Sequence, residues 1–183
     1  MTRNTLISIA VTLAILEMLI IWLIWSNFWR TITFLGSGIV ITVLTVVCVM
    51  VFAVRAEWRP ARQITFVMVG AVVVENGLKW IVHRAQPDEV FAHTMPLSYS
   101  FPSGHSLFAM AFYISFATIV ASRLTGIART TLRAVAVLLV ILIGASRIFL
   151  GVHYPSDVLG GYVTAVLWMT LFNVPFAKCR GDT

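Results

Sequence analysis

The sequence is poor in charge, cysteine and proline. Of its 183 residues only 11% are charged, seven are Asp or Glu, two are Cys and six are Pro. The two cysteines, Cys48 and Cys179, suggest neither a disulfide framework nor a cysteine-based metal site, and we expect both to be inert thiols. No repeat or low-complexity tract is present. A soluble domain of this size needs more polar surface than so few charges provide, which excludes that class.

Continuous apolar runs fill most of the chain instead, and 60% of its residues are hydrophobic. Roughly 20 apolar residues in a helix cross a bilayer core of about 30 Å, and the runs do not alternate as the strands of a membrane barrel would. The sequence therefore predicts an all-α, polytopic membrane protein: one domain over residues 1–183 that forms a bundle of six transmembrane helices. The predicted spans are Thr5–Phe28, Thr31–Val54, Gln63–Ile81, His105–Ser122, Arg133–Leu150 and Val158–Phe176.

The net charge of +6 is unevenly distributed over these spans. Most cations fall on one side of a six-helix alternation, and the positive-inside rule puts that side, with both termini, in the cytoplasm. These cations are Arg3, Arg55, Arg59, Arg62, Arg123, Arg129, Arg133, Lys178 and Arg180. The loops after the third and fifth spans then share the extracytoplasmic face of a cell membrane, which we expect to be a bacterial inner membrane. Because the cations anchor loops, they do not indicate a nucleic-acid partner.

One polar motif surrounds the loop between the fifth and sixth spans and reads Ser146-Arg147, five residues, His153, three residues, Asp157. Pro155 suits the first turn of the following helix, where a carboxylate also suits the helix dipole. Asp157 can fix one tautomer of His153 and leave the other ring nitrogen as a nucleophile toward phosphorus. Arg147 can grip two phosphate oxygens. The alternatives are a His–Asp pair that only packs loop against helix and an arginine that anchors a helix end at the membrane surface.

A second motif, Pro102-Ser103-Gly104-His105, opens the fourth predicted span. Ser103 is a candidate N-cap, and Gly104 lets another group come close to the backbone at the helix start. Backbone amides at a helix start bind anions, and His105 beside them can protonate a leaving oxygen. The alternative is an ordinary serine-capped helix with an interfacial histidine.

A third cluster runs from Lys79 to Pro87, ends the third predicted span on the same face and adds positive charge through Lys79 and Arg84. Glu75 precedes Lys79 by four residues, so the two side chains can pair along the helix. We expect Glu75 to orient the lysine in this way rather than to take part in chemistry.

The order of the three clusters resembles that of the type 2 phosphatidic acid phosphatase (PAP2) superfamily, the integral-membrane lipid phosphatases. The resemblance spans roughly Lys79 to Asp157 and agrees with six spans. It implies a two-step reaction without a metal or other cofactor, in which His153 is the nucleophile and forms a phosphohistidine, supported by Asp157. It also implies that His105 protonates the leaving group. The phosphoryl oxygens would be held by Lys79, Ser103, Gly104 and Arg147.

The Lys79–Pro87 cluster departs from the family pattern, which has Lys, six residues and then Arg-Pro. Here Gln86-Pro87 follows Lys79 at that spacing. Gln86 can donate hydrogen bonds but brings no charge. We include Arg84 and Gln86 in the predicted phosphate site, and Arg84 can take over part of the missing arginine's role. The alternative is a less cationic pocket with a different phosphate affinity or substrate choice.

Other polar residues give weaker evidence of a role in the active site. Glu17 lies about half-way along the first span, where it serves a function, pairs with a polar group on a neighbouring helix or stays protonated. His83, His93 and the loop Asp88–Tyr99 lie on the outward face, either as solvated loop residues or as the edge of the site. Gly160 and Gly161 predict close helix packing.

The function predicted from these residues is a metal-independent phosphatase for a lipid phosphate or lipid diphosphate at the outer leaflet. Candidate substrates by family analogy are phosphatidic acid, phosphatidylglycerol phosphate, undecaprenyl diphosphate and lipid A phosphate, and compact outward loops favour a simple lipid phosphate or a polyprenyl diphosphate. A lipid phosphotransferase is the close alternative.

A transporter needs polar residues through the membrane depth, whereas here they gather at one face, apart from Glu17 and Glu75. A non-catalytic lipid-binding protein has only Gln86 in its favour. The sequence does not indicate an oligomeric state.

Overall fold

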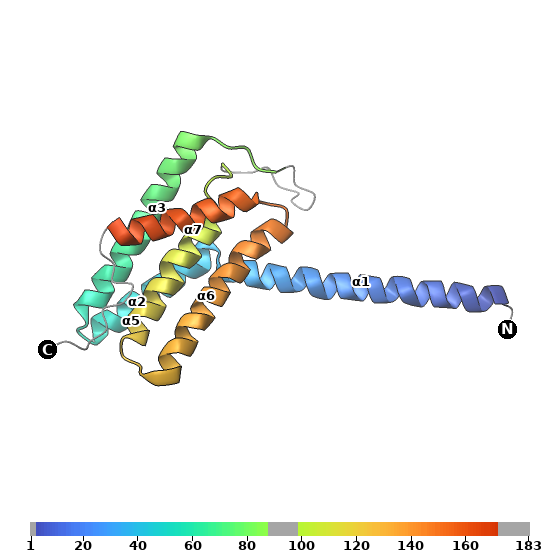
Figure 1. The fold of residues 1–183 in the computed structure, drawn as a ribbon, viewed down its shortest axis with the longest axis horizontal. Helices are drawn as coiled ribbons and strands as arrows, with labels where there is room; N and C mark the ends of the chain where they lie inside the picture. Colours follow the sequence, from blue (N-terminus) through green and yellow to red (C-terminus); the bar gives the residue numbers. More distant parts are fainter. Residues whose placement is uncertain (1–2, 88–98, 172–183) are drawn as a thin grey trace.

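The structure is a computed structural model that describes residues 3–87 and 99–171, with the side chains of the first helix described from Thr12 onward. Within these ranges every regular element is a helix, which confirms the all-α prediction (Figure 1). The elements in chain order are α1 (Arg3–Leu35), α2 (Gly38–Val54), α3 (Trp58–Val82), α4 (Gly104–Ala109), η1 (Met110–Ile114), α5 (Ser115–Ala121), α6 (Gly126–Phe149) and α7 (Pro155–Leu171). Cys179, His93 and most of the loop Asp88–Tyr99 lie outside the described residues.

The number of membrane-length helices differs from the predicted six. Four described helices are long and apolar enough to cross a membrane: Thr12–Leu35, Trp58–Val82, the continuous helix Gly104–Ala121 formed by α4, η1 and α5, and Gly126–Phe149. α2 is apolar but only 17 residues long, and the described part of α7 also has 17 residues. At about 1.5 Å per residue, each of these two helices measures about 26 Å, slightly less than a bilayer core.

The predicted boundary between the first two spans was wrong. We expected a break near Trp29 and Arg30, whereas α1 continues to Leu35 and the chain turns at Gly36 and Ser37. Ser37 is the N-cap of α2, and its Oγ accepts a hydrogen bond from the backbone N–H of Val40 at 3.3 Å. A long polar side chain is tolerated inside a helix, whereas a glycine followed by a capping serine ends one helix and starts the next. The sequence signal for this turn was therefore present but was outweighed by the polar residues before it.

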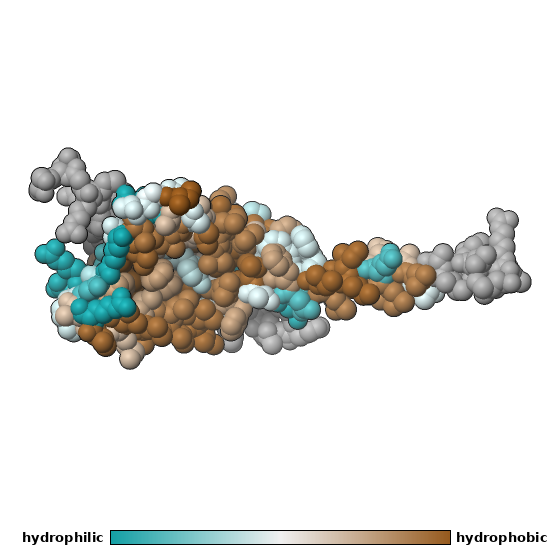
Figure 2. Space-filling view, turned by 90° about the horizontal axis from the view of Figure 1, so that it is seen from below, coloured by the Kyte–Doolittle hydropathy of each residue, from teal (hydrophilic) through white to brown (hydrophobic). Residues whose placement is uncertain are grey.

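The outer surface of the bundle is mainly hydrophobic, as Figure 2 shows for one face. Large apolar side chains such as Ile39, Val54 and Ile127 are 77%, 87% and 82% exposed. Apolar side chains on the outside are stable when lipid rather than water surrounds them. The N-terminal part of α1 extends away from the other helices (Figure 1), and Glu17 is exposed on this part rather than inside the bundle.

The bundle core brings the start of α4 against the start of α7. A Cβ added to Gly161 in α7 would come within 2.7 Å of the backbone oxygen of Ser103, so only glycine permits this approach. Phe101 packs on Gly160 in the same way. The prediction of close helix packing is therefore confirmed at Gly161, whereas Gly160 receives the ring of a residue in the loop before α4. The contact places two predicted motifs side by side.

Candidate active site

Asp157 is the centre of a polar cluster at the start of α7. The helix begins at Pro155 as predicted, and Asp157 lies in its first turn with 0% of its surface exposed. The backbone oxygen of Asp157 accepts a hydrogen bond of 3.0 Å from the N–H of Ser103, which ties the start of α7 to the start of α4. A buried carboxylate is stable only when donors or cations surround it.

Three groups from separate segments meet the Asp157 carboxylate. Nη1 of Arg84, which follows α3, lies 2.8 Å from Oδ1. The backbone N–H of Tyr154 donates to Oδ2 at 3.0 Å, and the hydroxyl of Ser100 donates to the same oxygen. Each carboxylate oxygen therefore has a partner, which stabilises the buried negative charge.

His153 lies in the loop between α6 and α7 and is buried, with 8% of its surface exposed. Its Nδ1 lies 3.6 Å from Oδ2 of Asp157 and 3.4 Å from Oγ of Ser100. Burial and then the positive charges of Arg147 and Lys79 lower the pKa of His153 to about 4, although Asp157 acts in the opposite direction. The imidazole is therefore uncharged at neutral pH, which is the form that can act as a nucleophile.

Arg147 lies in the last turn of α6, where its positive charge acts on both His153 and His105. Its Nη1 donates a hydrogen bond of 2.8 Å to Oγ1 of Thr33 in α1. This contact fixes the guanidinium beside the two histidines. A cation held next to two imidazoles is suited to binding an anion that comes between them.

His105 is the second residue of α4, and the charged groups that act on it are Arg147, His153 and Lys79. The structure thus brings together the histidines of two motifs that are 48 residues apart in the sequence (153 − 105). Ser103 is the N-cap residue of α4 as predicted, but its side chain makes no capping hydrogen bond. Its Oγ instead accepts a hydrogen bond of 3.1 Å from the hydroxyl of Ser106.

Lys79 and Glu75 form the predicted pair along α3, with 2.7 Å between Nζ and Oε1. Glu75 is buried, and its carboxylate lies directly against Gly104 at the start of α4, where a Cβ would collide with it. The positive charge on this side of the site is therefore partly compensated by a carboxylate.

The two remaining predicted residues are Arg84, which contacts the Asp157 carboxylate, and Gln86, which follows α3. Arg84 reaches Asp157, and its guanidinium also lies 4.2 Å from the centre of the Tyr154 ring. Gln86 lies in the non-helical segment after α3 and is half-buried. His83 ends α3 in a left-handed conformation, is exposed and packs its ring on Tyr99. The phosphate-binding roles of Arg84 and Gln86 stay predictions.

Ser100 is a site residue that sequence reasoning missed. It is fully buried, and its backbone N–H donates to the backbone oxygen of Arg84 at 2.8 Å. Its position just before the Phe101-Pro102 pair gives no chemical signal, because serine is a common residue of turns and loops. Only the approach of this loop to the start of α7 shows its contact with Asp157.

Among the described residues, no group of three or more His, Cys, Asp or Glu side chains could hold a metal ion. The carboxylate of Asp157 already accepts hydrogen bonds from Arg84 and Ser100. The expectation of a site without a metal stays a prediction that a chelator can test.

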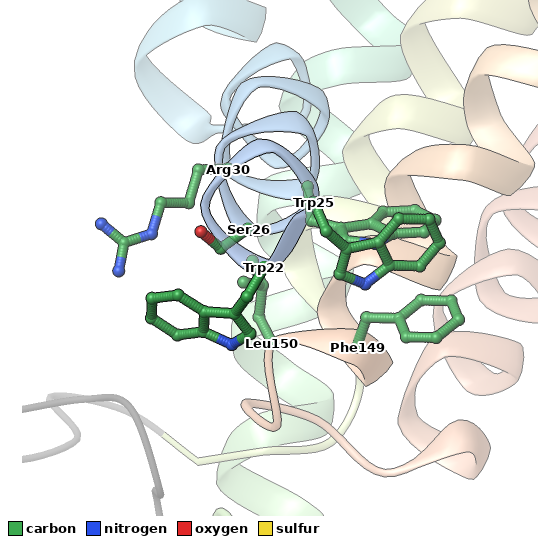
Figure 3. Close-up of a pocket in the computed structure, with 7 residues that line it drawn as sticks. Trp22, Trp25, Ser26, Arg30, Phe149 and Leu150 are labelled. Atoms are coloured by element: carbon green, nitrogen blue, oxygen red, sulfur yellow. The ribbon is translucent and has the colours of Figure 1, made fainter. Parts of the chain in front are cut away.

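An aromatic pocket lies next to the site, between α1 and the end of α6 (Figure 3). It contains about 440 Å³ of empty space, partly open to solvent. Its lining residues are Trp22, Trp25, Ser26, Trp29, Arg30, Phe149 and Leu150. Trp25 meets the Phe149 ring edge-on with 6.0 Å between centroids, whereas Arg30 points to the other side of α1 in Figure 3. Trp29 lies one helical turn before Thr33, which binds Arg147, so the pocket and the cationic site are neighbours along α1.

Comparisons with known proteins agree with this geometry. A family model described as the PAP2 superfamily matches residues 60–179. The chain is 31% identical over 136 residues to a lipid A 1-phosphatase of Rhizobium johnstonii, in an alignment that covers 69% of this chain and 52% of the relative. It is 30% identical over 148 residues to phosphatidylglycerophosphatase B of Bacillus subtilis, covering 78% of this chain and 71% of the relative. The chain thus spans about half the length of the first of these relatives.

Two solved structures share the fold. One is the crystal structure of a transmembrane PAP2 type phosphatidylglycerolphosphate phosphatase from Bacillus subtilis, with a TM-score of 0.72 and 30% identity, covering 82% of this chain and 74% of that one. The other is the crystal structure of Aquifex aeolicus LpxE, with a TM-score of 0.59 and 24% identity, covering 81% of this chain and 84% of that one. The second likeness supports the fold alone.

Proposed function

The chain belongs to the PAP2 superfamily, and from this premise we propose that it is an integral-membrane phosphatase that hydrolyses a lipid phosphate or lipid diphosphate. The observation that carries the proposal is the buried His153 held beside Asp157 at the start of α7, where the charges of Arg147 and Lys79 act both on it and on His105. One histidine can attack phosphorus while the other handles the leaving group, and the cations stabilise the charge on the phosphoryl oxygens.

In the first step, Nε2 of His153 attacks phosphorus, and the bond from phosphorus to the lipid oxygen breaks with its electron pair on that oxygen. His105, which enters this step as an imidazolium stabilised by the anionic phosphoryl group, gives its proton to the departing oxygen. The new nitrogen–phosphorus bond leaves a positive charge on the imidazole ring, and the carboxylate of Asp157 stabilises this charge. The resulting intermediate is a phosphohistidine.

In the second step, water attacks the phosphorus and gives a proton to His105. The nitrogen–phosphorus bond then breaks, so that inorganic phosphate leaves and His153 returns to its uncharged form. Arg147 and Lys79 would hold the phosphoryl oxygens in both steps, together with backbone groups at Ser103 and Gly104. The protein's contribution is mainly position and charge, as expected for phosphoryl transfer.

The proposal also includes the membrane topology. Six crossings would be α1, α2, α3, the continuous helix Gly104–Ala121, α6 and α7, with both termini in the cytoplasm. The site at the ends of α3 and α6 would then face the outer leaflet of a bacterial inner membrane. The headgroup would enter from that side while the chains stay in the bilayer.

The substrate would be an anionic lipid with its apolar chain against the aromatic pocket of Figure 3. The pocket's rings offer a wide apolar surface beside Arg147, and the exposed Arg30 adds a cation at the same end of α1. Phosphatidic acid, phosphatidylglycerol phosphate, undecaprenyl diphosphate and lipid A phosphate are the candidates to compare.

The test is phosphate release from these four lipids by the purified protein in detergent, with and without a chelator. We expect turnover that the chelator leaves unchanged, together with an acid-labile, alkali-stable phosphoenzyme when radiolabelled substrate is mixed and quenched. His153→Ala should abolish both signals, whereas His83→Ala, which removes an exposed histidine, should retain them. Turnover that survives His153→Ala, or that disappears with the chelator, would contradict the proposed mechanism.

A further inference from the structure

The ring nitrogen Nδ1 of His153 lies closer to a serine than to the carboxylate expected to orient it. The distance from Nδ1 to Oγ of Ser100 is 3.4 Å, within hydrogen-bond range, whereas the distance to Oδ2 of Asp157 is 3.6 Å. Ser100 lies 53 residues before His153 and is fully buried.

The direction of the hydrogen bonds follows from the number of donors. The hydroxyl of Ser100 has one proton, and it donates this proton to Oδ2 of Asp157. The same oxygen can therefore meet Nδ1 of His153 only as an acceptor, so the imidazole must carry its proton on Nδ1. This tautomer leaves Nε2 with its lone pair available.

We propose that Ser100 is a positioning residue that links His153 to Asp157, in the order Nδ1–H of His153, Oγ of Ser100 and Oδ2 of Asp157. The proposal rests on the proposed function, because it explains how the nucleophile of that reaction is held. Ser100 acts through His153 and does not touch the substrate.

The surroundings fix two members of this link, Ser100 and Asp157. The backbone N–H of Ser100 is bonded to the backbone oxygen of Arg84 at 2.8 Å, so the serine cannot move away from the cluster without breaking this bond. Arg84 and the N–H of Tyr154 hold the Asp157 carboxylate from its other sides. A fully bonded buried network of this kind allows one arrangement rather than several.

A hydroxyl between the two titratable groups also has a chemical consequence. A direct bond to a carboxylate favours the charged imidazolium, whereas a neutral hydroxyl that accepts the same proton favours it less. The serine thus fixes the tautomer while His153 remains uncharged before the reaction. Asp157 still lies close enough to stabilise the positive charge that appears once phosphorus is bound.

The first experiment measures the tautomer in the wild-type protein. The chain has four histidines, so nitrogen-15 spectra of the imidazole rings can be assigned with one His→Gln variant for each. We expect His153 to carry its proton on Nδ1 in the wild type and to populate both tautomers in Ser100→Ala. A wild-type His153 with its proton on Nε2 would overturn the proposal, whatever the activity.

The second experiment measures turnover. Ser100→Ala should lower kcat by about tenfold to a hundredfold, as loss of an orienting partner does in other sites, and leave KM within about twofold. Ser100→Thr keeps the hydroxyl and should restore most of kcat. Ser115→Ala removes a serine that is also buried but is bonded to Met169, and should leave kcat unchanged.

The outcomes separate this proposal from the proposed function. Full turnover in Ser100→Ala together with no turnover in His153→Ala would remove the serine link and leave the phosphatase mechanism intact. Full turnover in both variants would instead remove His153 as nucleophile. A Ser100→Thr variant as slow as Ser100→Ala, with the wild-type helix content, would also contradict the proposed link.

Discussion

Nη1 of Arg84 lies 2.8 Å from Oδ1 of Asp157, although the two residues are 73 positions apart in the sequence. The same nitrogen lies 2.7 Å from Oγ of Ser156, and the Arg84 side chain is 36% exposed while that of Asp157 is 0% exposed. Arg84 therefore separates a buried carboxylate from the surface of the protein. This position suggests that Arg84 supports Asp157 more directly than it binds phosphate.

We expect Arg84→Ala to lower kcat and thermal stability together, because Asp157 would stay buried with less compensation of its charge. Loss of a hydrogen bond to a buried charged group costs about 1–3 kcal/mol, and the partial exposure of Arg84 puts the effect at the lower end. Thermal unfolding in detergent and steady-state turnover measure both effects. In an Asp157→Asn background the stability loss should shrink. If Arg84→Ala only raises KM, Arg84 binds the phosphate instead.

His105→Ala should slow the reaction most for substrates whose leaving oxygen is basic. Protonation contributes typically 10²–10⁴-fold to such steps and little when the leaving group is already a stable anion. The measurement compares kcat/KM for an alkyl phosphate and for an aryl phosphate with an acidic phenol. An equal loss for both substrates would assign His105 a binding role.

The pH at which His153 becomes protonated, and activity is lost on the acid side, should lie well below 6.5. Burial and the charges of Arg147 and Lys79 lower the pKa of His153 to about 4, so the imidazole stays uncharged until the pH approaches that value. Between pH 6.5 and about 4 the unfolded chain binds a proton that the folded protein does not, so stability should fall as the pH falls. An NMR titration of His153 and unfolding curves at several pH values check this, and a midpoint near 6.5 would contradict it.

Gln86→Arg should strengthen inhibition by phosphate or vanadate if the pocket is short of positive charge. The Glu75 carboxylate already compensates Lys79 at 2.7 Å, so an added guanidinium on that side should increase anion affinity by roughly tenfold. Inhibition constants for both anions provide the measurement, with Gln86→Lys as the comparison for a point charge. Unchanged or weaker inhibition would show that position 86 does not reach the bound anion.

Trp25→Ala should raise KM for long-chain lipid phosphates by roughly fivefold, about 1 kcal/mol, because it removes an aromatic wall of the pocket beside Arg147. A water-soluble short-chain phosphate should show little change. Trp80→Ala is the matched control, since Trp80 is 72% exposed on α3 and does not line this pocket. An equal effect on long and short substrates, or an equal effect of Trp80→Ala, would place the lipid chain elsewhere.

Prediction from the sequence was most successful where the relevant contacts are local. The Glu75–Lys79 pair, the start of α7 at Pro155 and the position of Ser103 before α4 all depend on residues within one helical turn. The predicted boundary between α1 and α2 was wrong because polar residues near Arg30 are compatible with a helix interior, whereas the glycine and capping serine at 36 and 37 end one helix and start the next. Helix ends are the least certain part of such predictions, since a long polar side chain is compatible with either state.

The sequence by itself determined the all-α class and the family, because apolar runs and motif spacing are properties of neighbouring residues. Only the tertiary structure decided which groups meet the Asp157 carboxylate. Ser100 and Arg84 reach it from 57 and 73 residues away, through the close approach of α4 to α7 that Gly161 permits. A buried charge takes whichever donors the packing of the helices brings within reach, and no pattern along the chain specifies that packing.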